Sequence, residues 1–124
     1  MTDIVFKKRS STTGIVVKVA DKGGMSFKDL LKSHRQKGDF HVDDHFYIDN
    51  SGYIEAGRLL EDVAGFIYDD CNTSVHILVD GENGKINDCQ QQSVNNLLTS
   101  LADAYPDAVV RWEREKKCQK RYQR

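Results

Sequence analysis

The stretch HFYIDNSGYIEAGR, from His45 to Arg58, predicts two short strands joined by a tight turn. The turn runs from Asp49 to Gly52. Its Asn, Ser and Gly residues supply the local hydrogen bonds and the positive backbone angle that a hairpin needs. The second strand ends in EAGR, residues 55–58, which is an unusually specific closing sequence. We therefore expect a β-sheet that contains this hairpin.

The segments on either side of the hairpin add further strands. Gly14–Ala20 (GIVVKVA) and Ser74–Val79 (SVHILV) are almost continuously apolar, which indicates strands buried on both faces. Ile4–Arg9 and Ala108–Trp112 are predicted as two more strands. The segment Leu59–Phe66 fits either a short helix or an irregular loop.

Two segments have helical signals. Ser26 is a candidate N-cap for a helix over Phe27–Lys37, which Gly38 ends. Apolar residues between Gln90 and Tyr105 recur at helical spacing, and Pro106 ends that helix. The order of the elements favours an α/β (α+β mixed) fold, in which a central mixed sheet of about five to six strands is flanked by helices.

The length of 124 residues predicts one domain, 1–124, in which charge is unevenly distributed. Residues 113–124 contain six Lys or Arg and two Glu, a net charge of +4, and are predicted as a basic C-terminal tail. Residues 1–112 have a net charge of −5, which argues against a nucleic-acid-binding domain and suits a basic partner surface. Part of this negative charge comes from an acidic run, which fits either a solvated surface or a mimic of nucleic-acid charge. The run consists of Glu61, Asp62, Asp69 and Asp70.

Neither a membrane segment nor a secretory signal is predicted. No apolar run is long enough to span a bilayer, and the N-terminus lacks the pattern of a signal peptide. The three cysteines are odd in number and form no CxxC pair, which fits a reducing cytoplasm. Cys71 and Cys89 are expected to be inert thiols. His76 is a conceivable base for Cys71, but it is expected to pack within its strand.

With its elements in this order, the chain resembles the small phage lysozymes of the T-seven type. These are zinc-dependent N-acetylmuramoyl-L-alanine amidases and relatives of the peptidoglycan recognition proteins. The matching segments are VFKKRSSTTGIVV (5–17), the HF pair and hairpin ending in EAGR (45–58), NTSVHILVDG (72–81), the helix through 97–105 and AVVRWERE (108–115). The resemblance implies an amidase-like or peptidoglycan-recognition-protein-like fold. It also implies that the protein is located in the cytoplasm of the infected bacterial host.

The resemblance also implies where the chemistry of the family would take place. There, two histidines and a cysteine or acid bind zinc, and a tyrosine before the HF pair assists. In this chain Lys18 and Glu113 occupy the two histidine positions. The position of the third ligand falls near Arg121, not at Cys118, and Asp44 replaces the tyrosine. An ammonium group cannot coordinate zinc, so we expect neither catalytic residues nor a metal or other cofactor.

If the fold is kept, Lys18 and Glu113 would face each other where the zinc ion would have been. A buried pair of these charges would then link the second strand to the last one. Its net stabilisation would be near zero, because both charges lose their hydration. The alternative is that Lys18 extends to water.

A rewired metal site is a second interpretation. His41 and His45 are four residues apart and could bind a metal ion together with Asp43 or Asp44. An active hydrolase with relocated ligands would use His41, His45 and Cys118. Otherwise His45 is the structural histidine of the HF pair and His41 is a surface residue.

These features predict a phage pseudoenzyme that binds and inhibits another macromolecule. Lysozymes of this type also inhibit the phage RNA polymerase, so the expected partner is a phage or host RNA polymerase or a host-defence component. Neither nucleic acid nor a membrane is an expected partner. The alternative is a non-catalytic binder of peptidoglycan or muropeptides. The candidate binding residues are Phe6, Lys7, Lys8, Trp112, Arg121 and Tyr122.

Overall fold

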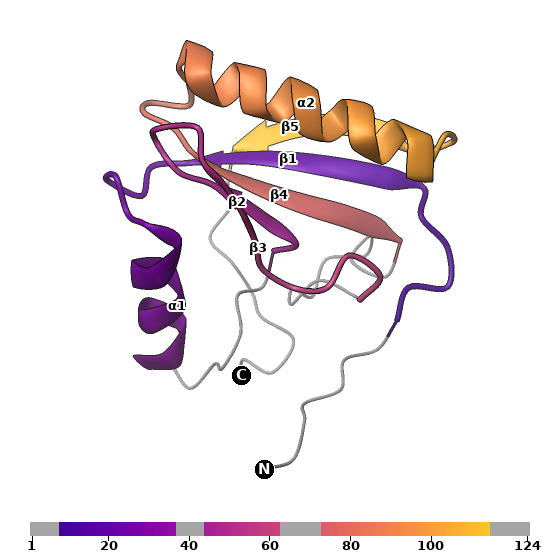
Figure 1. The fold of residues 1–124 in the computed structure, drawn as a ribbon, viewed down its shortest axis with the longest axis horizontal. Coiled ribbons are helices and arrows are strands. Elements are labelled where there is room, and N and C mark those ends of the chain that lie inside the picture. Colours follow the sequence, from indigo (N-terminus) through magenta and orange to yellow (C-terminus); the bar gives the residue numbers. More distant parts are fainter. Residues whose placement is uncertain (1–7, 37–43, 63–72, 115–124) are drawn as a thin grey trace.

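The computed structural model describes residues 8–36, 44–62 and 73–114. The strands within these ranges are β1 (Gly14–Ala20), β2 (Phe46–Ile48), β3 (Ile54–Ala56), β4 (Ser74–Asp80) and β5 (Val109–Arg114), and the helices are α1 (Phe27–Gln36) and α2 (Asp88–Ala104). The strands form one sheet, with α2 lying along one face and α1 standing at one end on the other side (Figure 1). The predicted mixed α/β class is confirmed.

The sheet is mixed, with the strand order β3-β2-β4-β1-β5. β1 pairs in parallel with β4 and β5, and β2 pairs in parallel with β4. β2 and β3 form the antiparallel hairpin. Because β1 and β4 have neighbours on both edges and elements on both faces, all their residues are buried. This burial explains their almost continuously apolar sequences.

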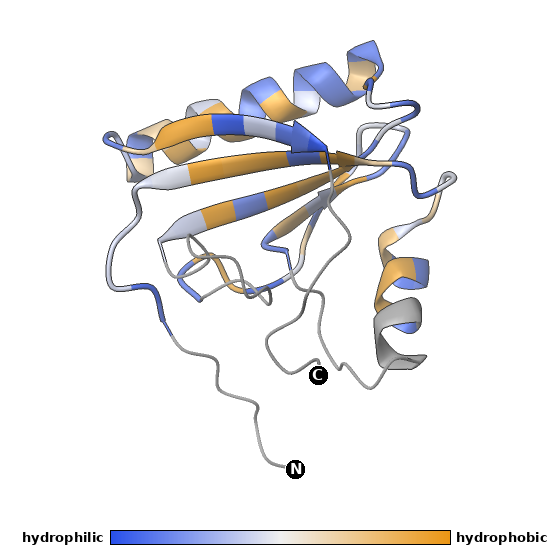
Figure 2. Cartoon of the chain, turned by 180° about the vertical axis from the view of Figure 1, so that it is seen from behind, coloured by the Kyte–Doolittle hydropathy of each residue, from blue (hydrophilic) through white to orange (hydrophobic). Residues whose placement is uncertain are grey.

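Hydrophobic side chains fill both faces of the sheet. Val94 and Leu101 of α2 pack against one face, whereas Leu30 of α1 packs near Tyr47 on the other. Figure 2 shows the middle strands as largely hydrophobic. Side chains alternate between the faces, so Lys18 lies in the same row across the sheet as Tyr47, on the α1 face. The sequence of β1 therefore places one cation within an apolar face.

Both predicted helices are present. Ser26 Oγ accepts a hydrogen bond from the Asp29 N–H at 3.2 Å, so Ser26 caps α1 as expected. α2 begins at Asp88 instead of Gln90 because Asn87 is its N-cap. The Asn87 side chain accepts from the Gln90 N–H at 2.9 Å, and the Gln90 side chain accepts from the Asn87 N–H at 3.0 Å. This reciprocal capping box starts the helix two residues before the apolar pattern.

The hairpin turn has the predicted chemistry. The Asp49 carboxylate accepts hydrogen bonds from the main-chain N–H groups of Ser51 and Tyr53, at 2.9 and 3.1 Å. Gly52 has a φ of +90°, which non-glycine residues rarely adopt. A Cβ at Gly52 would lie 2.9 Å from the carbonyl oxygen of Cys89, so the turn packs closely against the start of α2.

Strand β5 extends through Arg114, so the first two residues of the predicted tail belong to the sheet. Of the predicted strand Ile4–Arg9, only Lys8 and Arg9 are described, and Lys8 forms an isolated bridge with Asp62. None of the helices within the described ranges is long and apolar enough to cross a membrane.

The predicted segment Leu59–Phe66 is described as far as Asp62. There the Asp62 N–H donates to the Leu59 carbonyl at 2.9 Å and closes a turn. For these residues the loop alternative is correct.

Candidate functional site

A buried ion pair joins two positions that the sequence singled out. Lys18 Nζ of β1 lies 2.5 Å from Asp44 Oδ1, and each side chain is only 3% exposed. Asp44 lies two residues before β2, and β4 lies between β1 and β2. The pair therefore reaches across β4 on the α1 face and links β1 to the segment that leads into β2, a strand with which β1 shares no ladder.

The charges around Asp44 keep its carboxylate ionised. Burial raises the pKa of Asp44, but Lys18 lowers it through its charge and hydrogen bond, with smaller contributions from His76 and His45. The net result is a pKa of Asp44 below its usual value. Each charge of the pair therefore depends on the other, because an unpaired charge at this depth is strongly destabilising.

His45 is held in one neutral tautomer. Its Nδ1 accepts a hydrogen bond from the His76 main-chain N–H at 3.0 Å, so the ring proton is on Nε2. Nε2 donates to the carbonyl oxygen of Asp62 at 2.6 Å. Burial lowers the pKa of His45 to about 4, and the nearby Arg9 guanidinium acts in the same direction. Both ring nitrogens are engaged by the main chain, as expected for a structural histidine, whereas the other residues of the metal-site alternative, apart from Asp44, lie outside the described residues.

His76 completes this region, as the packed strand residue that the sequence predicts. It is buried in β4, and its ring stacks on that of His45 with centroids 6.4 Å apart. The buried polar cluster consists of Lys18, Asp44, His45 and His76, which all lie on the α1 face or at its border. Four polar side chains are thus buried together on a face that is otherwise largely apolar, which makes this cluster an unusual chemical feature of the described core.

Glu113 is not the ionic partner that we predicted for Lys18. The two residues are in register across β1 and β5, as neighbours in the sheet. However, Glu113 Oε2 pairs with Arg111 Nε at 2.7 Å, while Lys18 pairs with Asp44. The predicted Lys18–Glu113 pair is therefore wrong. Asp44 is almost fully buried and needs a compensating cation, whereas the Glu113 side chain is 20% exposed and has a cation two residues away.

These contacts determine how the residues at the family's zinc positions fit a metal ion. The Lys18 ammonium group has no lone pair for a metal and is already neutralised by Asp44. Glu113 is engaged by Arg111. Across residues 8–36, 44–62 and 73–114, no three His, Cys, Asp or Glu side chains are arranged to hold a metal ion. The residues described at these positions do not fit the zinc site of the family.

Two predicted binding residues are described. Lys8 is exposed and pairs with Glu61 and Asp62, at 2.8 Å in each case. Trp112 is 44% exposed on β5, near the border of the sheet. Cys89, predicted to be inert, is a free and exposed thiol at the start of α2. The other candidates lie outside the described residues, namely Phe6, Lys7, His41, Asp43, Cys71, Cys118, Arg121 and Tyr122.

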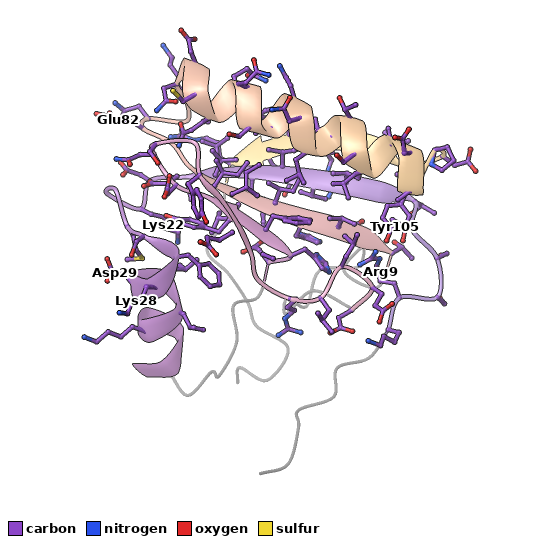
Figure 3. All side chains as sticks on the ribbon, viewed as in Figure 1. Arg9, Lys22, Lys28, Asp29, Glu82 and Tyr105 are labelled. Atoms are coloured by element: carbon purple, nitrogen blue, oxygen red, sulfur yellow. The ribbon has the colours of Figure 1, made fainter. Side chains whose placement is uncertain are left out.

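The sequence did not reveal the role of Arg9. Its guanidinium donates to the Leu60 carbonyl, to the Asp62 carbonyl at 3.0 Å and to the Tyr105 hydroxyl at 3.1 Å. It also lies 5.5 Å from the centre of the Tyr105 ring, toward which it points in Figure 3. Arg9 thus connects the N-terminal segment to the end of α2 and to the turn after the hairpin. No local pattern marks these contacts, because the partners are far apart in sequence.

A polar cavity lies at the other end of the sheet. It has a volume of about 660 Å³ and opens where β1 and β4 end, beside the hairpin turn and the start of α2. Lys22 and Glu82 lie at this end in Figure 3. The Asp80 carboxylate accepts the N–H groups of Lys22 and Gly24 at 2.7 and 2.8 Å, so its charge is used to shape the loop.

Comparison with known proteins supports the implied family. The chain is 31% identical over 120 residues to an endolysin of Enterobacteria phage K11, covering 89% of this chain and 80% of the relative. The chain belongs to the phage endolysin family. It is also 28% identical over 125 residues to the endolysin of Escherichia phage T7, covering 93% and 83% of the two chains. No family model matches the sequence.

Solved structures show that this endolysin-family chain has the amidase fold. The N-acetylmuramoyl-L-alanine amidase LysC from Clostridium intestinale superposes with a TM-score of 0.72 at 19% identity, covering 97% of this chain and 88% of LysC. The peptidoglycan recognition proteins LCa and LCx, in complex with tracheal cytotoxin, give a TM-score of 0.69 at 14% identity, covering 97% and 83%. The predicted amidase or peptidoglycan-recognition-protein-like fold is confirmed.

Proposed function

We propose that this endolysin-family chain does not hydrolyse peptidoglycan and acts by binding. The observation that carries this proposal is the ion pair between Lys18 and Asp44. The resemblance assigns one of these positions to a zinc ligand and the other to the assisting tyrosine. Here the two side chains neutralise each other in the core, and neither is available for catalysis.

Electrostatics supports this proposal. A divalent cation near Lys18 would be repelled by the ammonium group and would have to compete for Asp44. Breaking the pair would leave one buried charge without compensation. The pair links β1 to the segment before β2, and so maintains a connection across the sheet without a metal ion.

The first candidate role is inhibition of another macromolecule, with RNA polymerase or a host-defence component as the partner. Exposed large apolar side chains on the hairpin side of the sheet favour a protein partner. Tyr53 is 62% exposed and Leu59 is 65% exposed, on either side of the short edge strand β3. Aromatic side chains of this kind often anchor protein interfaces.

The second candidate role is binding of muropeptides. It is favoured by the similarity to the peptidoglycan recognition proteins LCa and LCx, whose structure contains tracheal cytotoxin. A muropeptide would then be held without being cleaved. Soluble muropeptide titrated into the protein should release heat on binding in this case, and should give no signal if the ligand is a protein.

The test of the catalytic proposal uses the full chain and, as a positive control, the phage K11 endolysin prepared in the same way. Both proteins are equilibrated with zinc, washed, analysed for metal content and incubated with purified sacculi. We expect this chain to release no L-alanine-linked peptides and to retain no stoichiometric zinc. One tightly held zinc ion per chain together with peptide release would overturn the proposal.

The partner class is tested separately. The tagged chain is purified from infected cells, and the bound proteins are identified by mass spectrometry. The matched control is the Tyr53→Ser/Leu59→Ser variant, which removes the exposed apolar side chains and leaves the buried polar cluster intact. Enrichment of RNA polymerase or a defence protein that the variant loses supports the first role. Muropeptide affinity without such enrichment supports the second.

A further inference from the structure

Strand β5 is an unusual edge for a sheet of this size. The sheet ends in β3 on one side and β5 on the other. β3 has three residues, whereas β5 has six and lies along one border of the sheet in Figure 2. Three large apolar side chains of β5 are exposed, with Val109 at 71%, Val110 at 42% and Trp112 at 44%. An edge strand of this length, with apolar and charged side chains in alternation, presents main-chain groups that can pair with another strand.

The main-chain N–H and C=O groups of β5 point alternately toward β1 and away from it. The Val109 N–H donates to the Thr13 carbonyl at 2.9 Å, so Val109 faces β1. Along a strand the main-chain groups alternate between the two edges, so Arg111 and Glu113 also face β1. Val110, Trp112 and Arg114 therefore direct their N–H and C=O groups outward. Among the described residues, no strand pairs with this outer edge.

Charge selects one way in which two copies of this edge can pair. In an antiparallel pair related by a two-fold axis, outward-facing residues must lie opposite outward-facing residues. An axis at Trp112 places Trp112 opposite its copy, and places Arg111 opposite Glu113 on both sides of the axis. A shift by two residues in either direction places Arg111 opposite Arg111 or Glu113 opposite Glu113. Directly opposed like charges disfavour both shifted registers.

We propose that β5 pairs with β5 of a second copy of this chain, antiparallel and centred on Trp112. The two sheets would join into one continuous sheet, with two Arg111–Glu113 pairs across the new junction. Within one chain these two residues already form an ion pair at 2.7 Å, so the dimer would bring four alternating charges together in a two-by-two cluster. Strand pairing alone buries little surface, so the dimer is weak and depends on concentration.

The proposal concerns assembly and does not depend on the catalytic state or on the ligand. Sedimentation velocity of the full chain, from about 1 µM to about 1 mM, covers the range of weak complexes. We expect a monomer at the lower end and a dimer at the upper end. The chain has one Trp, so its fluorescence should shift to the blue over the same range. A monomer at every concentration would overturn the proposal.

Charge reversal tests the register. Arg111→Glu and Glu113→Arg should each weaken the dimer at least about tenfold, because each places like charges opposite one another. An equimolar mixture of the two variants should form a heterodimer, since every opposed pair is then of opposite charge. The double variant should again form a homodimer. If either single variant dimerises as tightly as the wild type, the register is wrong.

A backbone variant separates strand pairing from side-chain contact. Trp112→Pro removes an outward N–H and leaves the hydrogen bonds to β1 in place, as edge strands allow. We expect this variant to remain folded by circular dichroism and to be monomeric. A dimer that persists in this variant would place the contact elsewhere on the molecule and contradict the proposal.

Discussion

Lys18 lies on β1 and Asp44 lies just before β2, a strand that is not a neighbour of β1, yet their charged atoms are 2.5 Å apart. The resemblance to amidases relates both positions to the zinc chemistry of the family. In this chain the two replacements contact each other, so they behave as a matched pair. The two positions are therefore coupled structurally, through one ion pair within the buried polar cluster.

Removal of either member of this pair should destabilise the fold. Lys18→Ala removes the buried cation that pairs with Asp44, and Asp44→Ala removes the buried carboxylate that pairs with Lys18. Each variant should lose about 3–5 kcal/mol of unfolding free energy in urea titrations. Replacement of both residues, as Lys18→Met/Asp44→Leu, should bring stability to within about 1 kcal/mol of the wild type or above it.

The control for this prediction is the exposed pair on β5. Glu113→Gln breaks the ion pair with Arg111, which is partly in solvent, and should cost no more than about 1 kcal/mol. If the double variant is as unstable as the two single variants, the buried pair has a structural role beyond charge compensation.

His45 should make the fold sensitive to mild acid. The pKa of His45 is about 4 in the folded chain and near 6.5 in an unfolded one, so the unfolded state takes up the proton first. Its contribution to stability is complete above pH 6.5 and is lost as the pH falls toward 4, by up to about 3 kcal/mol. Urea titrations at intervals between pH 7 and pH 4 would measure this slope.

A His45→Gln variant provides the control for the acid dependence. It should be less stable at neutral pH, because the two ring contacts change, and its stability should vary less between pH 6.5 and 4. Asp44 contributes in a lower window, since its lowered pKa places its protonation below the usual range of a carboxyl group. An unchanged slope in the variant would exclude His45 as the group responsible.

The hairpin turn should not tolerate a side chain at position 52. Gly52→Ala combines a φ of +90° with a Cβ that would lie 2.9 Å from the Cys89 carbonyl oxygen. Gly23→Ala is a matched control, because Gly23 has a φ of +66° and no atom within 4 Å of the added Cβ. Thermal unfolding should show a loss of about 1 kcal/mol for Gly23→Ala and a clearly larger one for Gly52→Ala. Equal losses would mean that the turn moves away from α2 at little cost.

Gln90 should contribute more than a surface glutamine of α2. Its side chain accepts from the Asn87 N–H, and it donates to the Asp80 carbonyl and to the Asp49 carbonyl. Gln90→Ala should cost about 2–3 kcal/mol, through the lost cap and the buried carbonyls left without a donor. Gln91→Ala removes an exposed bond to Asn95 and should stay within about 0.5 kcal/mol of the wild type.

The sequence predicted the strands and helices that have a local cause. β1 and β4 are buried on both faces and so are apolar throughout, and the hairpin turn is defined by Asp49 and Gly52. The start of α2 at Asp88 could have been predicted from the capping-box spacing of Asn87 and Gln90. The prediction used only the spacing of apolar residues and therefore began the helix two residues late. These features depend on residues close together in the chain.

The candidate site was predicted only in part, because its contacts connect distant segments. The resemblance drew attention to Lys18 and Asp44, because they occupy the positions of a zinc ligand and of the assisting tyrosine. The expected proximity of β1 and β5 is confirmed by their pairing in the sheet. The partner of Lys18 depended on the path of β2 past β4, which no local pattern encodes. The contacts of Arg9 with Tyr105 and Asp62 were missed for the same reason.

The parallel pairing of β1 also affects how the protein is made in the cell. Gly14 of β1 pairs with Ser74 and with Val109, so both of its neighbours are translated much later. During synthesis, β1 leaves the ribosome with both edges unsatisfied and with an aggregation-prone apolar sequence. Nascent chains that stop before β4 should therefore be strong clients for chaperones, and release from them should coincide with translation of the second half of the sheet.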